Sequence, residues 1–276
     1  MKKTVALLTT ALLVSSTAAA FASTPKPAHS GGMAGMNMSP ATPPAISGTP
    51  AMMGGTILDK AIPSDIAKIP LVDSNGKTFS LASLKGKTIV LTDFFTSCDM
   101  ICPMTSVNMR DIATAVAAAG KSSSVAVVEL TIDPQRDTVS RINAYQKLFG
   151  TSNWTIATGT ASDLKKLWAW FGVYAQQVPN TDGDAQDWQT GKKLTYDVIH
   201  EDIVTLIGPN LHYRWIDLGN PQVSNPTILP AKLKAFLSGL GLSNLVKPQQ
   251  PSWTTAVVYD AMQQIFGLPI GPKMKM

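Results

Sequence analysis

Strand-length apolar runs alternate with helical segments through the middle of this chain. Lys87–Phe95 (KTIVLTDFF) and Val125–Asp133 (VAVVELTID) are continuous apolar runs, which are typical of strands buried on both faces of a sheet. Helical segments follow at Pro103–Gly120, which begins with proline and ends with glycine, and at Thr138–Gly150, for which Asp137 is the expected N-cap. This alternation predicts an α/β fold whose sheet has a parallel core.

Further segments extend this sheet, and those towards the C-terminus add antiparallel strands to it. In chain order they are a hairpin that turns at Asn75-Gly76, a strand over Trp154–Gly159, a helix over Ala161–Val173, two strands over Asp202–Leu218 around a turn at Pro209-Asn210, and a closing helix over Leu229–Gly241. The late pair of strands predicts an antiparallel edge on the sheet. A polar loop rich in Gly and Asp, Asn180–Thr195, is inserted ahead of His200.

The N-terminus has the three parts of a secretory signal peptide, residues 1–22. Lys2 and Lys3 supply the positive start, Val5–Val14 the apolar centre, and Ala20–Ala22 the small-residue cleavage pattern. The apolar centre is about half as long as a membrane-spanning helix requires. We therefore expect cleavage after Ala22 and a periplasmic or secreted protein, with an uncleaved inner-membrane anchor as the alternative. In such a compartment a cysteine pair is free to be oxidised.

Composition divides the rest of the chain into three parts. Residues 23–62 are rich in Pro, Gly, Ala, Ser and Met, and they form the expected disordered tether because they cannot bury enough apolar surface to fold. Residues 63–241 hold the alternating strands and helices of the expected domain. Residues 242–276 form a C-terminal extension, in which Ser252–Phe266 is expected to be an amphipathic helix that packs on the domain or on a partner.

The tether contains soft metal ligands close together in sequence: His29, Met33, Met36 and Met38. Thioether and imidazole groups bind copper, so this segment predicts extra copper uptake. The alternative is that its methionines are incidental to a linker. The net charge of +5 comes without a basic run that carries interleaved aromatic residues, so we expect no nucleic-acid partner.

Both cysteines of the chain lie in one turn, Phe94–Ser106 (FFTSCDMICPMTS), between the first buried strand and the first helix. Cys98 and Cys102 are four residues apart, which in a helical turn places their Cα atoms about 6 Å apart, within the range of a disulfide. The same spacing directs both sulfurs to one side, where a soft metal ion could bind, and nearby helical N–H groups favour the thiolate. A disulfide across so short a loop stabilises little, so we expect a redox pair or a metal site rather than a structural staple.

Histidine is the natural third ligand beside two thiolates, and the chain has three histidines. His29 lies in the tether. His212 lies inside an expected strand, where it is interpreted as an ordinary strand residue. His200 lies between the inserted loop and the strand that follows, at a sheet edge where functional residues gather. Position alone leaves open whether His200 belongs to a site or to the scaffold.

Four segments of the chain carry motifs that occur together, and in this order, in one protein family. They are the Thr-x-Cys-x-x-x-Cys-Pro motif in FFTSCDMICPMTS, the Asp-Pro-x-x-Asp-Thr motif in ELTIDPQRDTVSRINAYQKLFG, the Trp…Thr-Gly segment in WTIATGTASDLKKLWAWFGV, and the His-led strand and turn in HEDIVTLIGPNLHYRWIDLG. From Phe79 to Gly219 the chain thereby resembles the Sco/SenC family of copper-binding, thioredoxin-like proteins. The resemblance implies a thioredoxin-like three-layer fold with a central mixed sheet, an N-terminal hairpin and a C-terminal helical extension.

The resemblance also implies a function. It implies copper, as Cu(I) or Cu(II), bound by Cys98, Cys102 and His200, and a metallochaperone that delivers copper to the Cu-A site of cytochrome c oxidase or reduces the cysteines of that site. The implied partners are the Cu-A subunit or another periplasmic copper protein, and a thioredoxin-like reductant, with membrane contact only through the client. Ile199 and Met100 depart from the residues usual in the family, which leaves the client open.

A site of this kind binds or releases copper according to the oxidation state of its two sulfurs. Two thiolates and a neutral His200 hold copper, whereas oxidation of Cys98 and Cys102 to a disulfide forces the metal to leave. Binding is expected to weaken as the pH falls through the pKa of His200. The alternatives are a thiol-disulfide oxidoreductase that works without metal, which normally has two residues between its cysteines rather than three, a peroxidase, and a binding module with an inert pair. Whether the protein is an enzyme is left open.

Overall fold

The computed structural model describes residues 49–50, 54–151, 153–181 and 185–271. The chain divides into two units, residues 1–34 and 35–276, and every described residue belongs to the second. The predicted signal peptide and the copper-binding side chains predicted in the tether lie outside the described residues.

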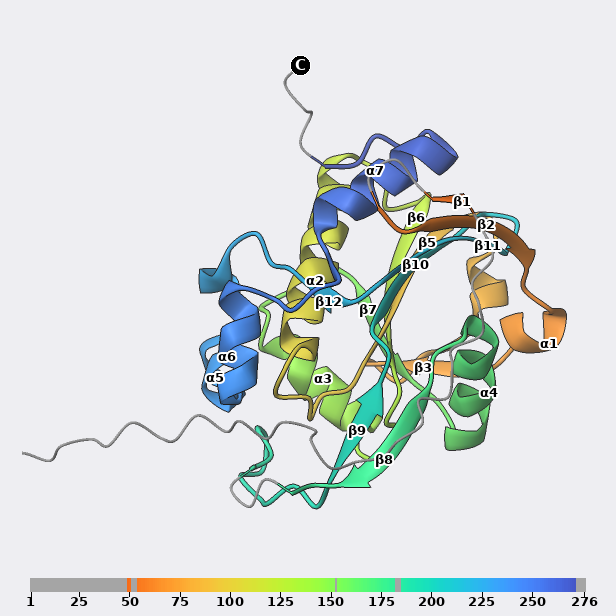
Figure 1. The fold of residues 1–276 in the computed structure, drawn as a ribbon. Coiled ribbons are helices and arrows are strands. Elements are labelled where there is room, and N and C mark those ends of the chain that lie inside the picture. Colours follow the sequence, from red (N-terminus) through yellow and green to blue (C-terminus); the bar gives the residue numbers. More distant parts are fainter. Residues whose placement is uncertain (1–48, 51–53, 152, 182–184, 272–276) are drawn as a thin grey trace, which may run out of the picture. The chain divides into compact units, whose positions relative to one another are not determined.

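A nine-stranded mixed sheet forms the centre of the described unit (Figure 1), with the strand order β1-β2-β11-β10-β5-β6-β7-β3-β4. Its strands are β1 Thr49–Pro50, β2 Thr56–Ala61, β3 Leu71–Asp73, β4 Thr78–Phe79, β5 Thr88–Phe94, β6 Val125–Thr131, β7 Thr155–Thr158, β10 Ile203–Ile207 and β11 His212–Leu218. β5, β6 and β7 are parallel, and β10 runs antiparallel to both β5 and β11. Every residue of β5 is buried, as its continuous apolar run predicts.

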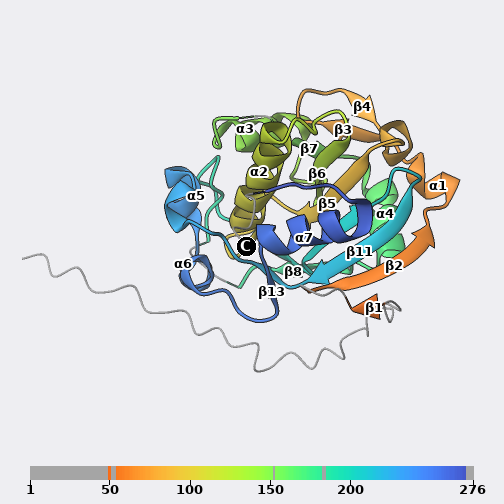
Figure 2. The same ribbon diagram turned by 90° about the horizontal axis from the view of Figure 1, so that it is seen from above.

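Helices cover both faces of this sheet. They are α1 Ser64–Ala67, α2 Cys102–Ala118, α3 Val139–Lys147, α4 Ala161–Phe171, α5 Ala231–Phe236, α6 Gly239–Val246 and α7 Thr255–Phe266, with short 3-10 helices over Leu81–Leu84 and Pro226–Ile228. α2 and α3 lie on one face, and α1 and α4 on the other (Figure 1). Figure 2 shows α7 beside α2, on the same side of the sheet. Each face therefore has its own apolar core.

Two short strand pairs lie outside the central sheet. β8 Ala175–Pro179 pairs antiparallel with β9 Tyr196–His200, and the two strands flank the predicted loop Asn180–Thr195. β12 Asn220–Pro221 pairs in parallel with β13 Ser252–Trp253 and ties the C-terminal part of the chain to the end of β11.

The predicted fold class is confirmed: this is a three-layer, thioredoxin-like α/β fold with a central mixed sheet and a C-terminal set of helices. The hairpin at Asn75-Gly76 is confirmed as β3 and β4, and Gly76 has the positive φ of 81° that its turn requires. The structure also places Thr56–Ala61, inside the range expected for the tether, in strand β2, because these residues pair with β11.

Two local predictions were wrong. The closing helix over Leu229–Gly241 is broken into α5 and α6, because Leu237 is extended with ψ of 135° and Ser238 starts a new helix as its N-cap. Asp137 is not the N-cap of α3; Thr138 is, and its side chain accepts a hydrogen bond from the backbone N–H of Arg141. No helix among the described ranges is long and apolar enough to cross a membrane.

Candidate metal centre

The two cysteines lie where β5 ends and α2 begins. Cys98 lies in the turn after β5, and Cys102 is the first residue of α2. Both are buried free thiols. The backbone N–H groups of Ile101 and Cys102 point at the sulfur of Cys98, with N···Sγ distances of 3.5 and 3.4 Å. The first N–H groups of the helix thus surround one sulfur, an arrangement that stabilises a thiolate.

The two thiols have opposite acidities. Burial raises the pKa of Cys98, but hydrogen bonds from Cys102 and His200 and the positive charge of His200 hold that pKa well below its usual value. Burial raises the pKa of Cys102 well above its usual value, and the neighbouring sulfur of Cys98 raises it further. Cys98 is therefore the thiolate of the pair, and Cys102 keeps its proton and donates it in a hydrogen bond to Cys98.

His200 comes to this pair of cysteines from a distant part of the chain. It is the last residue of β9, which is held in place by the pairing of His200 with Ala175 of β8. Its ring packs edge-on against Phe95, with 5.5 Å between the ring centres, and only 5% of its side chain is exposed. His200 and Cys102 both lower the pKa of Cys98, so the three predicted ligands are neighbours in the structure.

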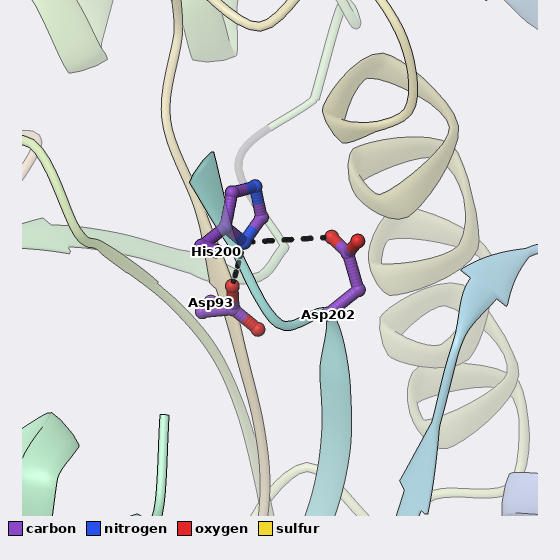
Figure 3. Close-up of side chains that lie close together, drawn as sticks. All are labelled: Asp93, His200 and Asp202. Carbon is purple, nitrogen blue, oxygen red and sulfur yellow. Dashed lines mark hydrogen bonds and ion pairs between the residues drawn. The ribbon is translucent and has the colours of Figure 1, made fainter. Parts of the chain in front are cut away.

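Two carboxylates fix the direction of the His200 ring (Figure 3). Nδ1 lies 2.7 Å from Oδ2 of Asp93 and 3.7 Å from Oδ1 of Asp202, and it also lies 3.0 Å from the backbone oxygen of Glu201. Burial lowers the pKa of His200, but the charge of Asp202 and the hydrogen bonds to Asp93 and Cys98 raise it well above its usual value. Nδ1 is therefore the nitrogen that keeps a proton, and the second ring nitrogen points away from both carboxylates (Figure 3).

The group formed by Asp93, His200 and Asp202 could itself be read as a metal site, since its ligand atoms lie within 4.8 Å of one another. The other oxygen of Asp93 already accepts the backbone N–H of Ile203 at 3.0 Å. Both oxygens of Asp93 and Nδ1 of His200 are thus used in hydrogen bonds within the protein. The arrangement matches the carboxylate–histidine pair that orients a ligand ring, which leaves Nε2 free to bind a metal once the ring is neutral.

Asp137 supports the cysteine turn in place of capping α3. It accepts hydrogen bonds from the backbone N–H of Thr96 (3.1 Å) and from the hydroxyls of Thr96 (2.5 Å) and Thr131 (2.6 Å). Burial raises its pKa to about 6. Arg141 completes this support, because its guanidinium donates to Thr96 and Ser97 directly ahead of Cys98, and to Asp187 in the inserted loop.

Sequence reasoning missed Asp93 and Asp202. The sequence pattern treats Asp93 as part of an apolar run, although a carboxylate near the end of a fully buried strand is the available signal. Asp202 was read only as the start of a strand. His212, interpreted as an ordinary strand residue, begins β11 and pairs with Asp59, whose side chain is mostly exposed.

Comparison with known proteins gives a consistent set of relatives. A family model described as SCO1/SenC matches residues 66–237. A Stutzerimonas stutzeri protein whose name refers to copper binding is 30% identical over 166 residues, which cover 58% of this chain and 75% of that protein. The "SCO1 protein homolog" of Bacillus subtilis is 24% identical over 159 residues, covering 57% of this chain and 75% of that protein. The solved structure of Bradyrhizobium japonicum ScoI with copper bound is 28% identical, with a TM-score of 0.44, and the match covers 61% of this chain and 97% of that one.

Proposed function

Because this chain belongs to the SCO1/SenC family, we propose that it is a copper-binding metallochaperone whose ligands are Cys98, Cys102 and His200. The observation that carries this proposal is that His200 and Cys102 both act on the buried sulfur of Cys98 and lower its pKa. The donor set fits copper, since thiolate sulfur prefers Cu(I) and an imidazole nitrogen helps to hold Cu(II). Relatives named for copper binding, or solved with copper bound, support the same metal.

The residues of the site divide the work between them. Cys98 supplies a thiolate whose charge the N–H groups of Ile101 and Cys102 stabilise. Cys102 and the His200 ring each lose a proton when they bind metal, so binding releases protons. Asp93 holds Nδ1 and thereby leaves Nε2 as the ring nitrogen that can bind metal. When Cys98 and Cys102 instead lose two electrons and join as a disulfide, both sulfur ligands are consumed and copper leaves.

The client in this proposal is the Cu-A site of cytochrome c oxidase, which receives copper from the protein or has its cysteines reduced by it. The proposed location is the periplasm, reached through the signal peptide predicted in residues 1–22, with membrane contact only through the client. Family membership supports this assignment, and another periplasmic copper protein is the alternative client.

The ligand assignment is tested by titrating the reduced protein with copper and recording the optical spectrum. Wild type is expected to show a thiolate-to-Cu(II) charge-transfer band. Cys98→Ser and Cys102→Ser should abolish tight binding, whereas His200→Ala should keep part of the Cu(I) and lose stable Cu(II). His212→Ala is the matched control, because His212 pairs with Asp59 at the surface. An unchanged Cu(II) spectrum in His200→Ala would remove His200 from the ligand set.

A thiol-disulfide oxidoreductase without metal is the second candidate. The low pKa of Cys98 beside the high pKa of Cys102 favours it, because a redox pair needs one thiolate to attack and one thiol to follow. Copper content and free-thiol count across a range of redox poise separate the two functions. The metallochaperone predicts that both fall together, and copper retained in protein without free thiols would contradict it.

A further inference from the structure

The loop between the two cysteines is hydrogen-bonded to a residue that lies just beyond the part of the chain matched by the family model. That match ends at residue 237. The next residue, Ser238, donates two hydrogen bonds to the backbone oxygen of Asp99, one from its N–H (3.0 Å) and one from its hydroxyl (3.2 Å). Asp99 directly follows Cys98, so the start of α6 touches the loop that carries the sulfur ligands.

Gly241 makes the approach of α6 to this loop possible. A Cβ atom added at Gly241 would lie 2.1 Å from the oxygen and 3.2 Å from the carbonyl carbon of Asp99. Gly241 lies inside α6 without a positive φ, so its backbone conformation does not need glycine. Glycine is needed because helix and loop come into backbone contact there. The N–H of Gly241 also donates to the hydroxyl of Ser238 at 3.1 Å, which orients that hydroxyl towards Asp99.

The packing of α6 makes this contact stiff. Leu237, which directly precedes the N-cap of α6, and Leu245, near the end of α6, are buried in the same apolar core as Cys98 and Cys102. Further along the chain, Trp253 of β13 is buried in that core, and α7 packs against α2, the helix that begins at Cys102. Figure 2 shows α5 and α6 at one side of α2. Because α6 is held in this way, it does not move easily. If Asp99 shifted relative to α6, the short loop between the cysteines would have to change its conformation.

We propose that Ser238 and Gly241 are positioning residues for the cysteine pair, and that they hold the loop in its reduced, metal-binding conformation by fixing the oxygen of Asp99. The contact exists while both cysteines are free thiols. The N–H groups of Ile101 and Cys102 that point at Cys98 belong to the same short loop, so their placement depends on where Asp99 is held. Loss of the contact removes stabilisation from the reduced form and shifts the equilibrium towards the disulfide.

The test compares Gly241→Ala with Gly239→Ala in the full mature chain. Gly239 is the matched control, because it lies in the same helix and an added Cβ there meets nothing within 4 Å. Metal-free protein is equilibrated with glutathione redox buffers, and the disulfide fraction is measured by alkylation and mass spectrometry. We expect Gly241→Ala to favour the disulfide by about tenfold, a shift of about 30 mV for this two-electron couple. Gly239→Ala should match wild type.

Ser238→Ala repeats the test without adding an atom. It removes the hydroxyl bond and keeps the N–H bond to Asp99, so we expect a smaller shift of about threefold in the same direction. Far-UV circular dichroism checks that each variant is folded. Wild-type redox equilibria in both Gly241→Ala and Ser238→Ala would overturn the proposal.

The copper side of this inference rests on the proposed function. We expect Gly241→Ala to lower Cu(II) affinity by about tenfold, as loss of an outer support for ligands typically does. The redox measurement uses no metal, so the two ideas can fail separately. A redox shift in a protein that binds no copper would support the positioning role and count against the metallochaperone.

Discussion

Asp93 gives His200 its direction. Its two carboxylate oxygens have two tasks, because one accepts the backbone N–H of Ile203 at 3.0 Å and the other accepts Nδ1–H of His200 at 2.7 Å. The side chain is fully buried. A single residue near the C-terminal end of β5 thus connects the sheet to the ring and determines which ring nitrogen stays free of hydrogen bonds to the carboxylates.

Asp93→Asn is expected to weaken Cu(II) binding by about 10- to 100-fold while the protein stays folded. The amide oxygen can still accept from Ile203, but the amide NH₂ then faces Nδ1 and favours the tautomer with its proton on Nε2. Competition titration gives the affinity, and ¹⁵N shifts of His200 in metal-free protein at high pH give the tautomer. Asp217→Asn is the control, because Asp217 accepts a local bond from the backbone N–H of Leu218. An unchanged tautomer in Asp93→Asn would refute this role.

Glu129 is another buried carboxyl, and its pKa is strongly shifted. Its two oxygens accept from the hydroxyl of Ser106 (2.5 Å) and from Nε1 of Trp154 (2.9 Å). Burial raises its pKa to about 8, these two hydrogen bonds oppose the rise, and the charges of Asp93 and Asp137 add to it. Glu129 is therefore protonated in the folded protein at neutral pH.

Glu129→Gln is expected to flatten the pH dependence of stability. Between about pH 4.5 and 8 the folded protein keeps a proton on Glu129 that the unfolded chain has lost, so the free energy of unfolding falls as the pH rises through this interval. The fall attributable to Glu129 is at most about 4 kcal/mol. Urea unfolding of metal-free protein at pH 5 and pH 8 measures it, with Glu201→Gln as the control. An equal fall in Glu129→Gln and wild type would show that Glu129 does not titrate in this range.

At the scale of elements, the start of α3 shows how the N-cap of a helix can be assigned to the wrong one of two adjacent residues. Asp137 and Thr138 are both good capping residues. Sequence alone does not reveal that the Asp137 carboxylate instead accepts hydrogen bonds from Thr96, which lies 41 residues earlier. The hydroxyl of Thr138 accepts the N–H of Arg141 at 3.3 Å. Asp137 lies 3.6 Å from the guanidinium of Arg141, and both side chains are buried.

Thr138→Ala is expected to lower the free energy of unfolding by about 1 kcal/mol, the usual cost of a lost cap. Asp137→Ala should cost more, about 3 kcal/mol, because it leaves Arg141 buried without this carboxylate and removes the acceptor of two threonine hydroxyls. Urea denaturation measures both. Thr160→Ala, which removes the N-cap of α4, is the control and should resemble Thr138→Ala. A smaller cost for Asp137→Ala than for Thr138→Ala would contradict this division of roles.

Elements with a strong pattern of their own could be predicted from the sequence. β5, α2 and β6 follow from an apolar run, a proline start and a second apolar run, which are local signals. The break between α5 and α6 was missed although Ser238 is a good N-cap, because the apolar spacing continues across it. β2 was missed because its place in the sheet depends on pairing with β11, more than 150 residues away in sequence.

At the scale of the whole molecule, the site joins segments that are far apart in the chain. The proposed ligands Cys98, Cys102 and His200 could be named from the sequence because they lie in motifs of known order. Their supports could not, since the bond from Asp93 to His200 spans 107 residues and the bond from Ser238 to Asp99 spans 139. Motif residues carry a local signature, whereas a supporting residue is recognisable only once the fold has placed it.

The structure indicates where the predicted N-terminal tether can be removed without disturbing the sheet. β1, Thr49–Pro50, pairs with β2, and the backbone oxygen of Gly54 accepts Nε1–H of Trp215 at 3.1 Å. A deletion that removed these residues would expose the edge of β2 and take a partner from a fully buried tryptophan. Removal of residues 23–48 leaves all of these contacts in place.

Deletion of residues 23–48 is expected to leave the fold and the Cys98–Cys102–His200 site intact while reducing total copper uptake under excess Cu(I). The reason is that His29, Met33, Met36 and Met38 supply soft ligands in addition to the three proposed in the folded site. Copper per protein is measured after gel filtration, and the Cu(II) spectrum checks the main site. A full-length variant with the three methionines changed to leucine and with His29→Ala keeps the tether length, so it separates ligand loss from truncation. Equal copper stoichiometry in wild type, deletion and substituted protein would show that these side chains do not bind copper.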